Sequence, residues 1–448
     1  MYPRFGQPVG LSWKPGDYSS PTPPLLVLSL FSVALTLLGF FVSVPLFKRF
    51  TILGLSLALL SLLLTWGKPF ALGPYHVDGI SQVFTLLALL GALWTVGLVR
   101  SGRFEFYLLV LYATLGMHLL ASTQNLILML VALEALSLPL YALATWRRGE
   151  GLEAALKYFL LGALAAAFFL YGTALHYGAT GNLLAGTPGE GPLYALALGL
   201  LLVGLGFKVA LAPFHFWTPD VYQGSPTPVV LFMATGVKAA AFAALLRVAA
   251  PGVPDALALL VAFSVVLGNL AALSQREAKR LLAYSSIAHA GYMALALYTG
   301  NATALGFYLL TYVMATGLAF AVLSEVSPDR VPLERLKGLF HRDPLLGLGL
   351  FVASLSLLGL PPLAGFWGKY LVFTEAAKAG QWGLLVLALI TSAVSAYYYL
   401  GLGLAVFQKG EAEARPRPLA RGVALAVALV LLLLGLVPGA VLPALAMG

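Results

Sequence analysis

Long apolar stretches alternate with short polar segments along almost the whole chain. A helix needs about 20 consecutive apolar residues to cross the hydrocarbon core of a bilayer. The pattern therefore predicts an all-α polytopic membrane protein with fourteen transmembrane helices in a single membrane domain over residues 24–448. The predicted spans are 24–46, 50–66, 81–99, 106–121, 125–145, 156–178, 193–216, 227–248, 255–274, 281–299, 303–323, 345–377, 382–407 and 421–445.

Residues 1–23, MYPRFGQPVGLSWKPGDYSSPTP, are polar and rich in proline and glycine. A signal peptide needs a basic segment followed directly by a cleavable apolar core, and this stretch has neither in that order. We therefore expect residues 1–23 to form a loose N-terminal extension.

Two predicted spans contain prolines that a continuous helix does not accommodate. Span 193–216 contains Pro213, and span 345–377 contains Pro361 and Pro362 within LSLLGLPPLAGFWGKY. Proline removes an amide donor and clashes with the carbonyl four residues earlier, so both spans are predicted to be broken helices.

The two broken helices hold matching places in the order of the spans. Spans four to eight (106–248) and nine to thirteen (255–407) make two blocks of five helices, and the broken helix is the fourth in each. Because five is odd, the two blocks cross the membrane in opposite senses. Paired interruptions in inverted five-helix repeats indicate the ion pathway of a transporter.

The composition supports a membrane protein and limits its chemistry. Hydrophobic residues make up 60% of the chain and charged residues 10%, with a mean hydropathy of +0.93. Soluble globular chains carry roughly 25% charged residues, so a water-soluble fold is excluded. The chain has no cysteine. Disulfides, thiolate nucleophiles, cysteine-ligated iron-sulfur clusters and zinc ribbons are therefore excluded within it.

The net charge of +9 comes from basic residues in short loops rather than from a basic domain. Such loops carry membrane topology signals, so we expect no nucleic-acid partner. With fourteen crossings, one face collects most basic residues, and the other keeps only Arg4, Lys14, Lys68 and Lys378. The positive-inside rule makes the rich face cytoplasmic and places both termini outside. The rich face carries Lys48, Arg49, Arg100, Arg103, Arg147, Arg148, Arg276, Lys279, Arg280, Arg330, Arg335, Lys337, Arg342, Lys409, Arg415, Arg417 and Arg421.

Four charged residues lie well inside predicted spans, away from their ends: Glu134, Lys208, Lys238 and Lys369. Each costs about 2.5 to 3.5 kcal/mol at mid-membrane, which indicates a functional role. The structural alternatives are lysines that snorkel to the interface and, for Glu134, a pair with a lysine on another helix.

The predicted breaks give these positions a chemical setting. Lys208 precedes the first break, near the C-terminal end of a half-helix, and Lys369 follows the second, near the start of one. Lys238 has small neighbours, Gly236 and Ala239 among them, which leave room for water. Burial disfavours a charged lysine and a nearby carboxylate such as Glu134 favours it. We therefore predict that the four residues form a switchable proton relay.

Further polar residues are candidates for the same relay: His215, His289, Lys157 and Asp220. His289 could equally be a hydrogen-bonded packing residue, and His215 could cap a helix or line an entrance. Glu153 precedes Lys157 by four residues, so an i,i+4 ion pair is the favoured interpretation of Lys157. The tyrosine run 397–399 is interpreted as an interfacial or packing feature rather than a proton path.

Four stretches resemble a known family: LVALEALSLPLYAL, GLGFKVALAPFHFWTPDVYQGSPTPVV, AKRLLAYSSIAHAGYM and LSLLGLPPLAGFWGKYLVF. They resemble the antiporter-like subunits of respiratory complex I, and among these subunit N of bacterial NADH-quinone oxidoreductase. The resemblance covers about residues 24–445 and implies the same fourteen-helix fold. It places the family's functional glutamate on Glu134 and its ionisable residues on Lys208, Lys238 and Lys369. A lysine at 369 and the absence of a long lateral helix after the last span are similar to subunit N.

The resemblance implies a proton-translocating subunit of NADH:quinone oxidoreductase in the bacterial plasma membrane. The chain itself carries no nucleotide fingerprint, metal-ligand cluster or catalytic triad. NADH, FMN, iron-sulfur clusters and quinone are therefore expected in partner subunits. These partners are other complex I membrane subunits and the peripheral redox arm. Membrane lipids are expected to surround the chain. Two alternatives stay open: a subunit of a multi-subunit cation/proton antiporter, and a non-transporting scaffold whose buried charges pair helices.

Overall fold

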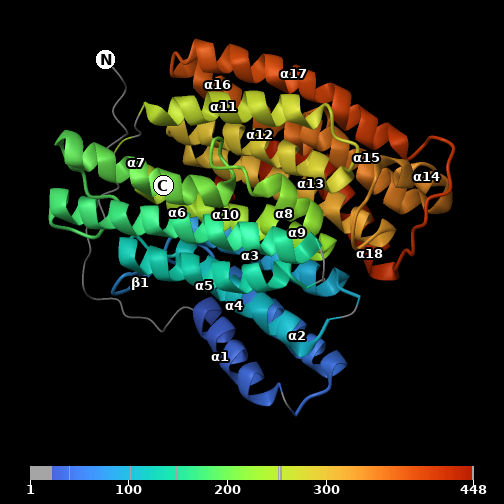
Figure 1. The fold of residues 1–448 in the computed structure, drawn as a ribbon, viewed down its shortest axis with the longest axis horizontal. Coiled ribbons are helices and arrows are strands. Elements are labelled where there is room, and N and C mark those ends of the chain that lie inside the picture. The colour runs from blue at the N-terminus through green and yellow to red at the C-terminus, as the bar shows by residue number, and fades with distance from the viewer. Residues whose placement is uncertain are drawn as a thin grey trace.

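The computed structural model describes residues 23–39, 41–100, 102–146, 150–250, 252 and 255–445. The predicted N-terminal extension, apart from Pro23, lies outside these ranges. Within them the chain is a bundle of helices with one small hairpin (Figure 1). The α-helices are α1 (Pro23–Leu38), α2 (Val44–Leu64), α3 (Gly79–Leu98), α4 (Phe104–Ala121), α5 (Leu126–Ala144), α6 (Glu150–Thr180), α7 (Gly191–Val209), α8 (Thr218–Gly224), α9 (Thr227–Phe232), α10 (Lys238–Ala249), α11 (Ala256–Ala272), α12 (Ala278–Tyr298), α13 (Ala302–Val326), α14 (Leu339–Arg342), α15 (Pro344–Leu358), α16 (Ala364–Lys378), α17 (Trp382–Ala405) and α18 (Pro418–Leu436).

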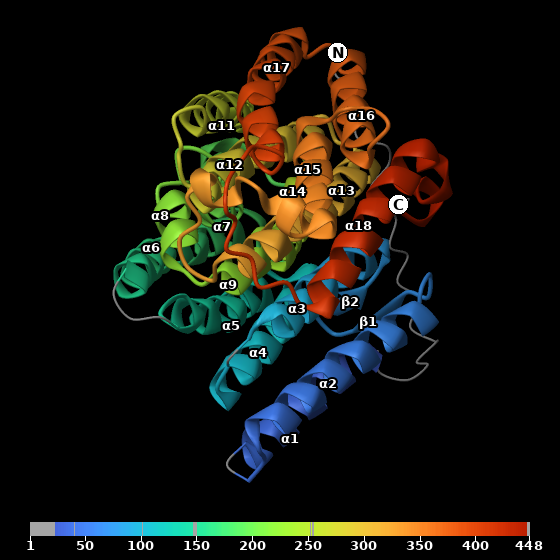
Figure 2. The same cartoon turned by 90° about the vertical axis from the view of Figure 1, so that its right-hand side faces the viewer.

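Within the described ranges, ten helices are long and apolar enough to cross a membrane. Three shorter apolar helices, Pro24–Leu38, Ala256–Ala272 and Pro344–Leu358, accompany them. The chain is thus a mostly helical, multi-pass membrane protein. Helices α1 and α2 lie at one edge of the bundle and α17 at the opposite edge (Figure 2).

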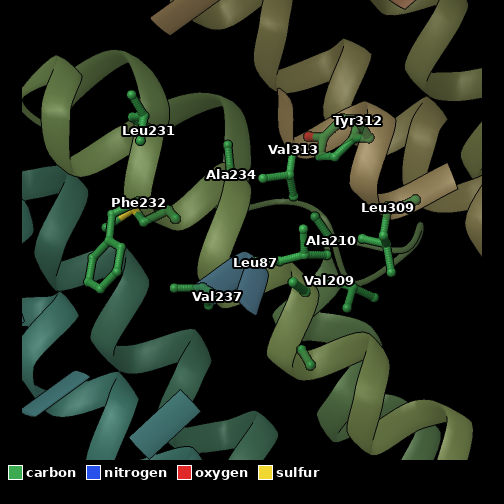
Figure 3. Close-up of a cluster of buried hydrophobic side chains, with 14 of the residues drawn as sticks. Leu87, Val209, Ala210, Leu231, Phe232, Ala234, Val237, Leu309, Tyr312 and Val313 are labelled. Atoms are coloured by element: carbon green, nitrogen blue, oxygen red, sulfur yellow. The ribbon is translucent and has the colours of Figure 1, made fainter. Parts of the chain in front are cut away.

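The centre of the bundle is formed by α13 and by the continuous span Thr227–Ala249, both almost wholly buried. This span consists of α9, the π-helical turn η1 (Met233–Val237) and α10. Apolar side chains from α3, α7, α9, η1 and α13 gather in one cluster, where Val209 and Ala210 lie near Leu309 (Figure 3). The end of α7 is therefore anchored in the most buried part of the molecule.

The structure corrects several predicted boundaries. The first predicted span, 24–46, is too long, because α1 ends at Leu38 and α2 begins at Val44 with Pro45 in its first turn. The last, 421–445, is also too long, because α18 ends at Leu436 before Pro438. Short 3₁₀ turns follow it at η3 (Pro438–Ala440) and η4 (Leu442–Leu445), and another, η2 (Leu333–Leu336), precedes α14.

A two-stranded antiparallel sheet interrupts the predicted all-α pattern between α2 and α3. Strands β1 (Phe70–Leu72) and β2 (Tyr75–Val77) pair in a hairpin. Its turn contains Gly73 at φ +57°, a conformation that L side chains rarely adopt. The hairpin is too short for the apolar pattern to reveal it.

Both predicted breaks are present. Helix α7 ends at Val209 because Ala210 takes the left-handed conformation, with φ 64°, and its N–H bonds the carbonyls of Gly206 and Phe207. Helix α15 ends at Leu358 before Gly359, with φ 91°, and α16 begins at Ala364. In both cases the helix ends before its proline, as the steric effect of proline on preceding residues requires.

Helix α18 covers the second break. A Cβ atom added to Gly435 would lie 1.8 Å from the carbonyl oxygen of Pro362, so only glycine permits this approach. The indole Nε1 of Trp367 donates a hydrogen bond of 2.7 Å to the carbonyl of Gly435. The irregular backbone at the break is thereby packed against protein rather than lipid.

Candidate functional site

Lys208 lies in the last turn of α7 and is only 5% exposed. Its Nζ donates hydrogen bonds to Ser137 Oγ at 2.7 Å and to Tyr158 OH at 3.2 Å. The same Nζ lies 4.9 Å from the centroid of the Tyr158 ring, within the range of a cation–π interaction. The ammonium is held by groups inside the bundle, so the snorkelling alternative does not apply.

Glu134 lies on α5, one turn before Ser137, and is partly buried. Its carboxylate interacts electrostatically with Lys208. No ion pair within 4.0 Å joins these two described residues. The structural-pair alternative for Glu134 therefore lacks its contact, and Ser137 occupies the position next to the ammonium.

Lys238 is the first residue of α10, directly after the π-helical turn η1. Its Nζ donates to the Ser286 carbonyl at 2.7 Å and to Ser286 Oγ at 2.5 Å. It lies 5.4 Å from the ring centroid of Tyr312, whose hydroxyl also donates to Ser286 Oγ. Single π turns inside helices occur frequently at functional sites.

Lys369 lies in α16, and its Nζ reaches back across the break to the carbonyl of Leu358 at 2.8 Å. Ser392 Oγ accepts a second hydrogen bond at 2.8 Å, and the Tyr292 ring centroid is 5.3 Å away. The prediction considered the dipole at the start of the following half-helix. The structure instead puts the ammonium at the C-terminal end of α15, where the dipole favours a cation.

Three of the four buried lysines that the structure describes, Lys208, Lys238 and Lys369, share one type of surrounding, which we call a lysine cradle: a serine hydroxyl that accepts from Nζ and a tyrosine ring within cation–π range. The pairs are Ser137 and Tyr158, Ser286 and Tyr312, and Ser392 and Tyr292. Among the residues that the structure describes, no carboxylate forms an ion pair with any of the three lysines. The sequence analysis missed these serines and tyrosines, because isolated hydroxyl residues in apolar spans carry no distinctive spacing.

His289 lies on α12 between the cradles of Lys238 and Lys369. Its ring centroid is 5.1 Å from that of Tyr312 and 6.0 Å from that of Tyr292. Its Nδ1 shares a hydrogen bond with Tyr308 OH and its Nε2 one with Tyr399 OH, both at 2.8 Å. His289 is thus a hydrogen-bonded residue, as the packing alternative expects, and it also bridges two charged centres.

A small cavity with room for about one water molecule opens beside His289. Its lining comes from α12, α13 and the two helices at the second break: His289, Tyr308, Thr311, Tyr312, Ser356, Leu357 and Gly365. Five of these seven residues carry a polar side-chain group, and the volume is at the lower limit for holding one water.

The tyrosine run is predicted to be an interfacial or packing feature, and its three members differ in the structure. Tyr397 is 74% exposed, whereas Tyr398 and Tyr399 are buried. The hydroxyl of Tyr399 bonds Ser285 at 2.5 Å as well as His289. Consecutive helical residues point in directions about 100° apart, and this spacing could have indicated that one of the three faces the interior.

The remaining candidates lie in or near the segment between α7 and α9. His215 is 6% exposed, and its Nδ1 has no hydrogen-bond partner among the described residues. Lys157 forms the predicted ion pair with Glu153 at 2.8 Å and a second one with Asp220 at 2.8 Å. Asp220 also pairs with Arg280 at 2.7 Å, so the structure brings these residues together at the rim of the bundle, apart from the cradles.

Asp220 lies on the short helix α8, outside the long spans. Partial burial acts to raise the pKa of its carboxyl, but hydrogen bonds from Lys157 and Arg280 outweigh burial and hold the pKa below its usual value of 3.8. The carboxylate is therefore stably ionised near neutral pH. Its ion pairs connect α8 to α6 and to α12.

Within the described part of the chain, no group of three or more His, Asp or Glu side chains could hold a metal ion. His118, which gave no signal in the sequence, is buried between Tyr75 OH at 2.8 Å and Thr85 Oγ1 at 2.9 Å. It connects the hairpin to α3 and α4.

Residues 123–395 match the family model described as NADH:quinone oxidoreductase/Mrp antiporter, TM. The chain is 82% identical over 426 residues to NADH-quinone oxidoreductase subunit 14 of Thermus thermophilus, which covers 95% of this chain and 99% of that protein. It is 44% identical over 347 residues to NADH-quinone oxidoreductase subunit N of Salinibacter ruber, covering 72% and 70% of the two chains.

A chain in the solved structure of respiratory complex I from Thermus thermophilus with bound aureothin matches the fold with a TM-score of 0.92. It is 81% identical, and the match covers 95% of this chain and 100% of that chain. These similarities confirm the resemblance seen in the sequence motifs. The chain therefore belongs to the NADH:quinone oxidoreductase/Mrp antiporter family and, within it, to the branch of bacterial NADH-quinone oxidoreductase subunit N.

Proposed function

We propose that this chain is a proton-translocating membrane subunit of NADH:quinone oxidoreductase and that the lysine cradles carry the protons. The observation that supports it is that Lys208, Lys238 and Lys369 are buried and held by hydroxyls and aromatic rings, with no paired carboxylate among the described residues. Such residues within membrane spans are rare and mark ion and proton pathways.

The relay begins at Glu134 and Lys208. Burial disfavours the charged form of a lysine, and the nearby carboxylate favours it. A displacement of Glu134 relative to Lys208 therefore changes the proton affinity of the ammonium, which releases its proton toward Lys238. His215, with its unpartnered Nδ1, lies in the segment between α7 and α8, where we place the uptake of the proton.

The second half of the relay runs from Lys238 past His289 to Lys369, which exchanges protons with the outer face. The cavity beside His289 supplies a position for a bridging water between the two cradles. Moving one unit charge against 100 mV requires about 2.3 kcal/mol, so this transfer has to be coupled to a strongly downhill reaction.

That reaction belongs to partners in this proposal, since the chain has no cysteine. NADH oxidation with FMN and iron-sulfur clusters takes place in the peripheral arm, quinone is reduced by other subunits, and neighbouring antiporter-like subunits adjoin this chain in the bacterial plasma membrane. The high identity to subunits of NADH-quinone oxidoreductase supports this assignment.

We also propose fourteen crossings arranged as inverted repeats over 106–248 and 255–407, with both termini outside. The ten long helices reach this number with α1, α11 and α12 and with α15 and α16 taken as one broken span. The breaks after α7 and α15 fall at matching places in the two repeats.

The test of the relay is Lys208→Ala in the complete complex, reconstituted into vesicles. We expect proton uptake per NADH oxidised to fall several-fold, measured with a pH-sensitive dye beside the NADH:quinone rate. The matched control is Lys409→Ala, which removes an exposed lysine and should leave both readings unchanged. Normal pumping by the Lys208→Ala complex would refute the relay.

Two alternatives make different predictions. If the chain co-purifies in mild detergent with flavin and iron-sulfur subunits, the result supports a pump of complex I. If it is recovered with antiporter-like subunits alone and transports in a sodium-dependent way without NADH oxidation, the result supports a cation/proton antiporter. A scaffold would keep pumping intact after combined substitution of Glu134, Lys208 and Lys238.

A further inference from the structure

A buried polar cluster lies beside the cradle of Lys369, and we call it the Asn269 cluster. It consists of Asn269 on α11, Tyr292 on α12, and Thr391 and Tyr398 on α17. The exposed fraction of each side chain is 5% or less. The four polar groups are hydrogen-bonded to one another, so the cluster is an organised feature rather than a set of isolated polar residues.

Along the cluster, each polar group donates a hydrogen bond to the next group, from Tyr398 toward Thr391. Tyr398 OH donates to Asn269 Oδ1 at 2.8 Å, and Asn269 Nδ2 donates to Tyr292 OH at 3.0 Å. Thr391 uses its proton on the Leu387 carbonyl at 2.8 Å, so it accepts from Tyr292 at 3.2 Å. The second proton of Asn269 Nδ2 is held by the Val265 carbonyl at 2.7 Å.

The two ends of the cluster lie next to the relay. Tyr398 neighbours Tyr399 with ring centroids 4.4 Å apart, and Tyr399 OH bonds Nε2 of His289. At the other end, the ring centroid of Tyr292 lies 5.3 Å from Lys369 Nζ, which also donates to Ser392 Oγ. A series of polar side chains therefore lies between His289 and Lys369.

Asn269 is the member of this series of polar groups that does not relay protons. A hydroxyl or an imidazole can accept one proton and release another, because each is both donor and acceptor. A side-chain amide separates these functions between nitrogen and oxygen and has no group that ionises near neutral pH. Its two bonded N–H groups also prevent the amide from turning over.

We propose that Asn269 is an insulating residue, which interrupts the chain of hydroxyls between His289 and Lys369 so that protons must pass through the cavity. This inference rests on the proposed function, because insulation matters only if Lys238 and Lys369 belong to one relay. A permanent connection of hydroxyls from His289 to Lys369 would bypass the cavity and let protons flow back down their gradient when no NADH is oxidised. Asn269 is thus a positioning residue that acts through Tyr292 and Tyr398.

The test compares Asn269→Asp with Asn269→Leu in the complete complex reconstituted into vesicles. Asp has nearly the same shape but a carboxyl group that can accept and release protons, whereas Leu cannot. We expect Asn269→Asp to raise passive proton conductance several-fold, measured without NADH from the decay of an imposed pH difference, and to lower the protons pumped per NADH. Vesicles with Asn269→Leu should have the same passive proton conductance as the wild type. The NADH:quinone rate should be unchanged in both variants.

Further variants distinguish a failure of the proposed insulating role from a failure of the proposed relay. The leak of Asn269→Asp should disappear when Lys369→Ala is added, because the leak runs through Lys369. If Asn269→Asp assembles poorly, Asn269→Ser serves instead, since its hydroxyl and a water complete the hydroxyl chain. If vesicles with Asn269→Asp conduct protons no faster than wild-type vesicles, the insulating role is overturned. The same holds if Asn269→Leu conducts protons as fast as Asn269→Asp. Normal pumping by Lys369→Ala alone would instead overturn the relay itself.

Discussion

The buried lysines are held by neutral groups, and this distinguishes them from the ion pairs at the rim of the bundle. Lys208, Lys238 and Lys369 contact serine hydroxyls and tyrosine rings, whereas Lys157 contacts two carboxylates. Neutral partners stabilise the charged form less than a carboxylate does. The two groups of lysines are therefore suited to different tasks, proton exchange in the interior and fixed structure at the rim.

Asp220 gives a pH-dependent prediction for the rim. Its folded pKa lies below the ordinary value of 3.8, so its contribution to stability is full above that value and is lost as the pH falls through the folded pKa. We expect Asp220→Asn to lower the melting temperature of the detergent-solubilised complex slightly at pH 7, because partly exposed ion pairs contribute about 0 to 1 kcal/mol. The difference from the wild type should shrink in acid. A difference that stays constant with pH would contradict this account; Asp255→Asn, at an exposed carboxylate, is the control.

The sequence singled out the charged candidate residues of the proposed relay but not the groups that surround them. Glu134, Lys208, Lys238 and Lys369 stand out because charge is expensive in an apolar span. Ser137, Tyr158 and Tyr399 do not stand out, since hydroxyl residues are tolerated there at little cost. Their role depends on which helices adjoin, and a single sequence does not contain that information.

At the scale of elements, the second break depends on the close approach of α15 and α16. A Cβ atom added to Gly365 would lie 1.8 Å from the Ser356 carbonyl oxygen, and that atom belongs to backbone that cannot rotate away. The break therefore requires glycine at the start of α16.

We expect Gly365→Ala to destabilise the subunit by about 1 to 3 kcal/mol, the usual range for overpacking, and to lower pumping because the cavity wall shifts. Thermal unfolding of the solubilised complex measures the first effect and dye-based proton uptake the second. Gly383→Ala on α17 is the matched control, because nothing lies within 4 Å of its added Cβ atom. Equal melting temperatures for the two variants would count against the packing argument.

The pattern of apolar residues predicted where most helices lie, because each long span is nearly continuous in sequence. It was less reliable where two apolar helices meet without a polar loop. The boundary between the first two predicted spans, 24–46 and 50–66, was placed too late for this reason, since α1 ends at Leu38 and α2 begins at Val44. The π turn at 233–237 was also invisible, because it changes the hydrogen-bond pattern without changing composition.

At the scale of the whole molecule, the proposed orientation places 181–190 outside and 406–417 in the cytoplasm. The chain has no cysteine, so a single introduced cysteine reports its own location without background from this subunit. We expect Gly186→Cys to react with a membrane-impermeant maleimide in intact cells and Lys409→Cys to react only in inverted vesicles. Both positions are exposed in the structure. The reverse labelling pattern would contradict the orientation while leaving the fold unaffected.

The contact between α18 and the second break bears on how the protein is made. The carbonyl of Pro362 meets Gly435, and Trp367 bonds the same glycine. Ribosomes deliver α16 to the membrane before α18 is synthesised, so during translation the exposed peptide groups of the break have no permanent cover. The backbone of the second break is therefore covered only after α18 has entered the bilayer, so the packing around this break is completed late in the synthesis of the chain.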